Sequence, residues 1–156
     1  MNYIDLLLNL QIFLKDALTY VEKVSICKYH PSNFPPFNKY CILISPAWKE
    51  TKSRANRTKE TLCGVDIVCI VRNYHPTLSI IGGLTPDIGY LQMVDDVTET
   101  LIEFGKAYES ELLILYNEMD QRIDFKTNKQ PEREDFYHEI TLPYQVKLKP
   151  QTFEIK

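Results

Sequence analysis

The sequence predicts an α+β fold: an antiparallel or mixed β-sheet of about four to five strands, with two main amphipathic helices packed on one face. Residues 62–72 form an apolar, β-branched strand, and amphipathic helical patterns lie before and after the strand-forming region. The predicted order is helix, three strands, helix and then further strands. A chain of 156 residues with 44% apolar and 25% charged residues is typical of one globular domain, and we assign 1–156 to a single domain.

The first helix is predicted from residue 3 to about residue 21. Its apolar residues recur at helical spacing: Leu6, Leu7, Leu10, Phe13, Leu14, Ala17, Leu18 and Val21. A first strand follows at Val24–Tyr29. The next segment, Pro31–Asn38, is a turn-rich loop that cannot join a central ladder. Its two aromatic residues, Phe34 and Phe37, either form a contact surface or cover an edge of the core.

A hairpin with a long basic loop is predicted next. One strand, Tyr40–Ser45, is expected to end at Pro46, and the other is expected to span Leu62–Tyr74. The intervening loop, 46–61, holds five cations against two acids, a net charge of about +3. The cations are Lys49, Lys52, Arg54, Arg57 and Lys59. A loop of this length is usually functional or disordered, and three roles stay open: a solvated hairpin tip, a protein–protein contact or a nucleic-acid contact.

Alternation divides the second strand of this hairpin between two faces of the sheet. One face carries Cys63, Val65, Ile67, Cys69 and Val71, and the other carries Asp66, Val68, Ile70 and Arg72.

The second helix is predicted to start at Thr85-Pro86-Asp87, because a capping hydroxyl, a proline and an acid are typical of a helix N-terminus. It is expected to run to about Ala107. Its predicted apolar stripe is Leu91, Val94, Thr98, Leu101, Ile102 and Gly105, and its predicted solvent side carries Asp95, Asp96, Glu99 and Glu103. From Asp87 to Asp124 the chain holds ten acids and two bases, a net charge of −8.

The last third of the chain is less regular. The segment 109–120 fits either a helix or a buried strand, and both stay open. We expect a short strand at Arg122–Phe125, a polar turn region at Thr127–Glu134 and a final strand at Phe136–Lys149. Pro143 within that strand predicts a bulge or a sheet edge.

No set of residues has the spacing of a catalytic or metal site, so we expect no enzyme activity, no cofactor and no metal. The four cysteines lie in apolar runs without a C-x-x-C pair, which favours buried thiols in a reduced cytoplasmic setting. The apolar stretch 6–18 is too short and too polar to span a bilayer. A net charge of −3 argues against a general nucleic-acid binder.

The order of these parts resembles the tail terminator proteins of long-tailed bacteriophages and the related neck, or head–tail joining, proteins. The resemblance is carried by the N-terminal helix, the His30–Asn38 loop, the strand Tyr40–Pro46, the long polar hairpin loop, the acidic helix Pro86–Ala107 and the strand Phe136–Ile140. It covers nearly the whole chain, but the family has no short diagnostic motif.

The resemblance implies a structural virion protein: a small subunit that forms a hexameric ring, caps the tail tube and joins it to the head connector. Genomic DNA would pass through the ring without sequence-specific binding, and assembly would occur in the host cytoplasm. The basic loop and the acidic helix are complementary on neighbouring copies, and a head-to-tail contact of that kind can close a ring. The predicted subunit and partner interface is Lys49, Lys52, Arg54, Arg57, Lys59, Asp95, Asp96, Glu99, Glu103, Phe34 and Phe37.

Two alternatives belong to other functional classes. One is a small cytoplasmic metal-dependent enzyme, or nuclease, that uses the acidic cluster Asp95, Asp96 and Glu99. The other is a nucleic-acid-binding accessory module that uses the basic loop.

Overall fold

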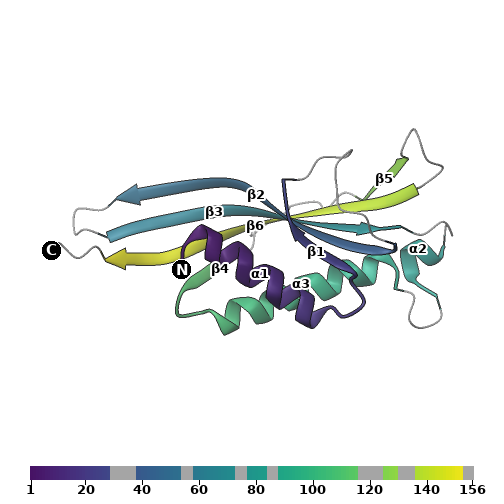
Figure 1. Cartoon of the computed structure of the whole chain (residues 1–156), viewed down its shortest axis with the longest axis horizontal. Helices are drawn as coiled ribbons and strands as arrows, with labels where there is room; N and C mark the ends of the chain where they lie inside the picture. The colour runs from purple at the N-terminus through teal and green to yellow at the C-terminus, as the bar shows by residue number, and fades with distance from the viewer. Residues whose placement is uncertain are drawn as a thin grey trace.

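The protein is a two-layer structure, with one mixed sheet and the two long helices packed on one of its faces (Figure 1). This computed structural model describes residues 1–28, 38–53, 58–72, 77–83, 88–115, 125–129 and 136–152. The arrangement confirms the α+β class and the one-sided helical layer expected from the sequence.

The elements follow one another as α1 (Tyr3–Ala17), β1 (Lys23–Ile26), β2 (Tyr40–Ser53), β3 (Thr58–Val71), α2 (Leu78–Ile81), α3 (Tyr90–Ala107), β4 (Leu112–Leu115), β5 (Lys126–Lys129) and β6 (Phe136–Thr152). The strand order in the sheet is β1-β2-β3-β6-β4, and β5 also pairs with β6. Among the strands of the described residues, β1 and β2 run parallel, and the other pairs are antiparallel.

The main core lies between the sheet and the two long helices. The predicted alternation in β3 is confirmed, because the residues from Cys63 to Val71 at odd positions are all buried in this core. Leu6, Leu10 and Leu14 cover the sheet from α1. The Phe13 and Phe104 rings meet edge to face at 5.4 Å and join α1 to α3.

The opposite face of the sheet holds a second, smaller apolar cluster. Val68 and Ile70 of β3 lie there with Cys41 and Leu43 of β2, as the alternation predicts. Both faces of the central strands are therefore apolar, which explains the continuous apolar run of β3.

Two predictions are wrong: that β2 ends at Pro46, and that a long hairpin loop follows it. β2 continues to Ser53 and β3 begins at Thr58, so most of 46–61 is a strand ladder. Pro46 is accommodated because the pairing shifts between Pro46 and Trp48, which leaves a β-bulge. The register with β1 also ends at Ile44, so Pro46 lies where β2 has become an edge strand.

Both helices differ from their predicted bounds. α1 ends at Ala17 rather than near residue 21, and the described part of the second helix, α3, begins at Tyr90. The predicted start at Thr85-Pro86-Asp87 falls largely on residues outside the described ranges.

The buried stripe of α3 is also rotated from the predicted one. The buried residues are Met93, Val94, Val97, Thr100, Leu101 and Phe104, whereas Leu91 and Ile102 are exposed. α3 contacts both the sheet and α1, so its buried face is set by two neighbours at once. The sequence pattern alone does not show where those neighbours lie.

The structure resolves the ambiguous segment 109–120 in favour of a strand, since β4 occupies Leu112–Leu115. The turn region expected at Thr127–Glu134 is wrong for 127–129, because β5 forms at Lys126–Lys129, and 130–134 lie outside the described residues. Pairing with β6 explains the strand, because its ladder stabilises a polar sequence. The strand expected at 122–125 lies outside the described residues except for Phe125.

Pro143 lies within β6 at a point where only one side of the strand is paired in the described structure. It faces Asp66 of β3 on that side. On the other side, β4 pairs with 145–148 and β5 pairs with 136–139, and Pro143 falls between them. A proline is tolerated there because its missing N–H leaves no gap in a ladder, which confirms the predicted edge position.

Gly64 is required by the packing of Trp48, its neighbour across the β2–β3 pair. A Cβ atom added at Gly64 would overlap the Trp48 indole ring. We expect Gly64→Ala to reduce the free energy of unfolding by about 1–3 kcal/mol through overpacking. Urea denaturation measures it. In a Trp48→Ala background the cost of Gly64→Ala should largely disappear; an equal cost in both backgrounds would contradict this packing.

Candidate assembly interface

Three strands extend past the helices and form an arm, which we define as residues 49–53, 58–62 and 149–152. In Figure 1 the arm projects at the left, beyond the N-terminal end of α1. Its ladder is continuous with the body: Ser53 pairs with Lys59 at one edge, and Thr58 pairs with Thr152 at the other. Most of the predicted basic loop therefore belongs to two of the three strands of this arm, and β6 supplies the third.

The root of the arm is fastened to α1. The Tyr3 hydroxyl donates a 2.6 Å hydrogen bond to the Gly64 carbonyl oxygen from the helical side. Trp48 covers Gly64 from the opposite side, since Cys63 and Val65 point toward the helices. These contacts hold the direction of the arm relative to the body.

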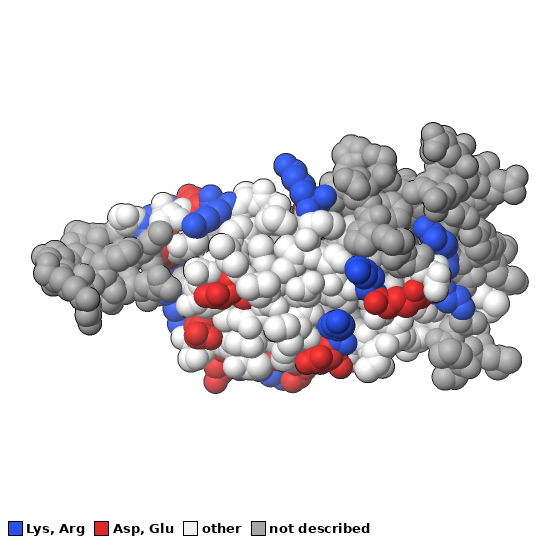
Figure 2. Space-filling model, viewed as in Figure 1, with Lys and Arg blue, Asp and Glu red and all other residues white. Residues whose placement is uncertain are grey.

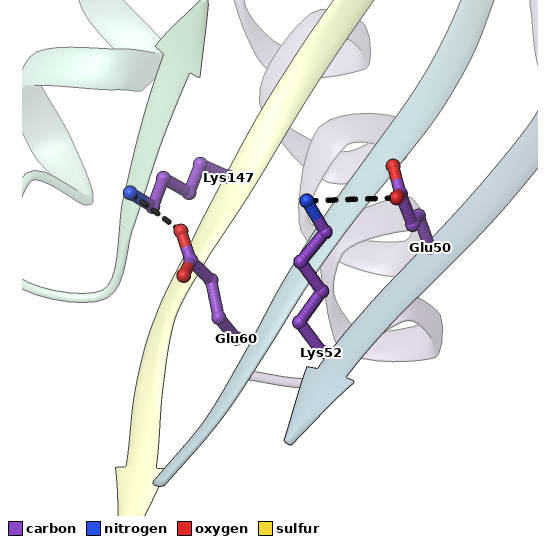
Figure 3. Close-up of polar contacts among 4 residues, drawn as sticks. All are labelled: Glu50, Lys52, Glu60 and Lys147. Carbon is purple, nitrogen blue, oxygen red and sulfur yellow. Dashed lines mark ion pairs between the residues drawn. The ribbon is translucent and has the colours of Figure 1, made fainter. Parts of the chain in front are cut away.

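Two ion pairs of the described residues lie on these strands, one at a predicted cation and one at an acid of the arm (Figure 3). Lys49 and Lys52 on β2 are exposed. Lys52 lies 3.8 Å from Glu50, and Lys147 lies 2.6 Å from Glu60. Both side chains of the Lys52–Glu50 pair are exposed, so this pair contributes little to stability. The second is more shielded, because the Glu60 side chain is only 16% exposed.

Four predicted interface residues, Arg54, Arg57, Phe34 and Phe37, lie outside the described residues. Lys59 belongs to β3, but its side chain is also outside the described part.

The predicted acidic surface is present on α3, with one exception. Asp95, Glu99 and Glu103 are exposed at a spacing of four residues, so they form one stripe. Glu103 lies 3.4 Å from Lys106 of the same helix. Asp96 instead points toward the segment after α1, where the Tyr20 hydroxyl donates a 2.7 Å hydrogen bond to its Oδ2 atom.

The hydrogen bond to Asp96 gives this acid a structural role. Burial raises the pKa of Tyr20, and the Asp96 carboxylate raises it further. The phenol therefore stays protonated and remains a donor. Asp96 joins α3 to the segment after α1, and sequence reasoning missed this because the pairing crosses 76 residues.

Charge does not gather into one patch on the face shown in Figure 2. Acidic and basic side chains are interspersed there and are separated by uncharged surface. The basic and acidic segments of the sequence therefore do not produce separate charged patches on this face. Any electrostatic contact through it would be the sum of several weak pairs.

The cysteines and His138 lie in environments that suppress their charged forms. Burial raises the pKa of Cys41 and Cys69 to about 12 and that of Cys63 to about 11, so these thiols stay protonated. Burial lowers the pKa of His138, whose ring lies 5.1 Å from the Tyr90 ring. Within the described ranges, no three His, Cys, Asp or Glu side chains are grouped so as to hold a metal ion.

Sequence reasoning also missed an exposed apolar stripe on α1. Ile4, Leu8 and Ile12 recur every four residues and are exposed on the solvent side of the helix. The signal was available, because apolar residues occur all round this helix rather than on one stripe. Among the described helices, none is long and apolar enough to cross a membrane.

Neither a scan against protein-family models nor a search of curated proteins finds a match to this sequence.

The first prediction at this site concerns the hydrogen bond that links α3 to the segment after α1. Tyr20→Phe removes the hydroxyl donor and leaves the Asp96 carboxylate without its partner. We expect a loss of about 1–2 kcal/mol in the free energy of unfolding, because hydrogen bonds to charged groups are stronger than neutral ones. Chemical denaturation measures the loss. Asp95→Asn, one residue away and exposed, is the control and should change stability by less than about 0.5 kcal/mol. Equal effects would argue against the Tyr20–Asp96 bond.

The second prediction concerns Asp66, which lines a hollow on the sheet face away from the helices, with Lys28, Ser45 and Thr141 among its neighbours. Burial raises the pKa of Asp66 above its ordinary value of 3.8. The folded state therefore holds the proton more tightly than the unfolded state, and stability falls as the pH rises through the folded pKa. Asp66→Asn should raise the melting temperature at neutral pH.

The gain should vanish below pH 3.8, where the wild-type carboxyl is protonated in both states. Thermal melts of both proteins across this range test it. If Asp66→Asn lowers the melting temperature at neutral pH, an attraction to Lys28 outweighs the cost of burial.

Proposed function

We propose that this protein is a structural subunit of the virion of a long-tailed bacteriophage, acting as a tail terminator or neck protein. Copies of the chain form a ring, with six subunits implied by the resemblance. The ring caps the tail tube and joins it to the head connector, while DNA passes through it without sequence-specific binding. It is assembled in the host cytoplasm.

The observation that carries this proposal is the arm. It is a polar, three-stranded extension past the helical layer, and the exposed side chains of β2 in it include Lys49, Glu50 and Lys52. The helical core does not need these residues for burial. A stiff extension of this kind supports a role in contacting another subunit, because its direction is already set before contact.

The acidic stripe of α3 offers a partner surface for the arm. Asp95, Glu99 and Glu103 are exposed on the helical layer, whereas Lys49 and Lys52 are exposed on the arm. Two different surfaces of one subunit would then meet on neighbouring copies, which is the head-to-tail geometry that closes rings. Each exposed ion pair contributes only about 0.2–1 kcal/mol, but a ring repeats the contact at every interface.

The proposal is tested by reversing the charge of the arm. In Lys49→Glu with Lys52→Glu, we expect weaker ring formation and a nearly unchanged melting temperature, since both side chains are exposed. Raising the salt concentration should also weaken the wild-type ring, because it screens exposed charges. Light scattering and negative-stain images at low and high salt measure assembly.

The matched control is Lys15→Glu with Lys23→Glu, which makes the same charge change at exposed positions of α1 and β1. This control should assemble like the wild type. Two results would contradict the proposal: a protein that never forms rings, alone or with tail tubes, or an arm variant that assembles like the wild type at every salt concentration. Mg²⁺-dependent DNA cleavage lost in Asp95→Asn would instead favour the enzyme alternative.

A further inference from the structure

The two edge strands of the sheet, β1 and β4, differ in how their outer backbone groups are covered. At the β1 end, the Gln11 side-chain amide of α1 donates a 2.9 Å hydrogen bond to the Val24 carbonyl oxygen. α1 also packs along β1 and so protects this edge. At the other end, β4 pairs with β6 on one side, and no strand of the described structure lies beyond it.

The backbone groups that face away from β6 can be identified from one hydrogen bond. The Lys149 N–H donates to the Glu111 carbonyl oxygen at 3.0 Å. In an antiparallel pair only alternate residues face the partner strand, so Leu113 also faces β6, whereas Leu112 and Ile114 face outward. The Leu112 N–H is occupied by the Tyr108 carbonyl oxygen at 3.0 Å.

Three backbone groups of β4 therefore point to the open edge: the Leu112 carbonyl, the Ile114 N–H and the Ile114 carbonyl. In the described part of the chain none of them has a hydrogen-bond partner. Unpaired groups along an exposed apolar strand favour pairing with another chain.

Two of the side chains around this edge are apolar and exposed, and the charged residues Lys106, Glu109 and Lys149 also line it. Leu113 is 54% exposed and Ile102 on α3 is 39% exposed. Between α3 and β4 lies a groove of about 470 Å³, whose lining includes both residues together with Leu112 and Ile114. Gly105 also lines the groove, and a Cβ atom built there would make ordinary van der Waals contact with Cδ1 of Ile114 at 3.4 Å.

We infer that the β4 edge pairs with the β4 edge of a second copy of this chain, antiparallel and two-fold symmetric about Leu113. The observation that selects a second copy is the pattern of free groups. Leu112 offers an acceptor only, and Ile114 offers the donor that such an acceptor requires. When Leu112 lies opposite Ile114 of the partner subunit, each Ile114 N–H donates to a Leu112 carbonyl oxygen, and both open donors are satisfied.

This register places the two Leu113 residues directly opposite each other. They form a non-hydrogen-bonded pair with a Cα–Cα distance of about 4.5 Å, and their side chains meet on the sheet face away from the helices. The contact uses the same patch on both copies, so it closes with two subunits and leaves no open β4 edge. It differs from the head-to-tail contact of the proposed ring, and either can fail without the other.

A cysteine at position 113 tests the register directly. In Leu113→Cys the two thiols would lie at a Cα separation that a disulfide can span. We expect mild oxidation to convert most of this variant to a covalent dimer, as measured on non-reducing gels. Ile12→Cys places an equally exposed thiol on α1, 59% exposed in the wild-type residue, and is the control for random cross-linking. Both variants are made in a Cys27→Ser background, because Cys27 is half-buried whereas Cys41, Cys63 and Cys69 are buried.

A charge at the same position tests the energetics. Leu113→Lys places two cations directly opposite each other, which should raise the dimer dissociation constant about tenfold or more. Ile12→Lys should leave it unchanged, and sedimentation equilibrium measures both. The inference is overturned if the wild type is monomeric and position 113 cross-links no faster than position 12. It is also overturned if Leu113→Lys associates like the wild type, a result that would leave the proposed ring untouched.

Discussion

The structure depends on the double pairing of β3, which lies between β2 and β6 over nearly its full length. Because both of its edges are occupied, its side chains can alternate only between the two sheet faces. One face receives the helices, and the other carries the small cluster around Val68 and Ile70. The layer arrangement, the position of the core and the direction of the arm all follow from this one strand.

The strand ladder of the arm continues the ladder under the helices, and this continuity keeps the backbone of the arm ordered. The three strands that pack against the helices, β2, β3 and β6, also extend past them. The bulge at Pro46 and the packing of Trp48 on Gly64 mark the boundary between the two parts. A contact made by such an arm loses less conformational entropy than one made by a flexible loop of the same length would, since the backbone is already ordered.

The candidate site was predictable only where local sequence decides exposure. The exposed acids Asp95, Glu99 and Glu103 follow from helical periodicity. Asp96 was assigned to the same acidic surface, yet the structure places it against Tyr20. The open edge of β4 could not be predicted either, because its free groups depend on which side β6 occupies and on the Tyr108 carbonyl that holds the Leu112 N–H.

The sequence by itself determined the α+β class, the two long helices and the alternation from Cys63 to Val71, because each depends on the period of side chains along a single segment. Tertiary structure decided the course of the chain past Pro46, the buried stripe of α3 and the choice of a strand at Leu112–Leu115. In each case the deciding contact comes from a part of the chain distant in sequence. The β3 ladder and the packing of Trp48 on Gly64 continue β2 past Pro46. α1 and the sheet together set the buried face of α3, and pairing with β6 makes β4 a strand. Pairing across a sheet is non-local, so no window of neighbouring residues contains it.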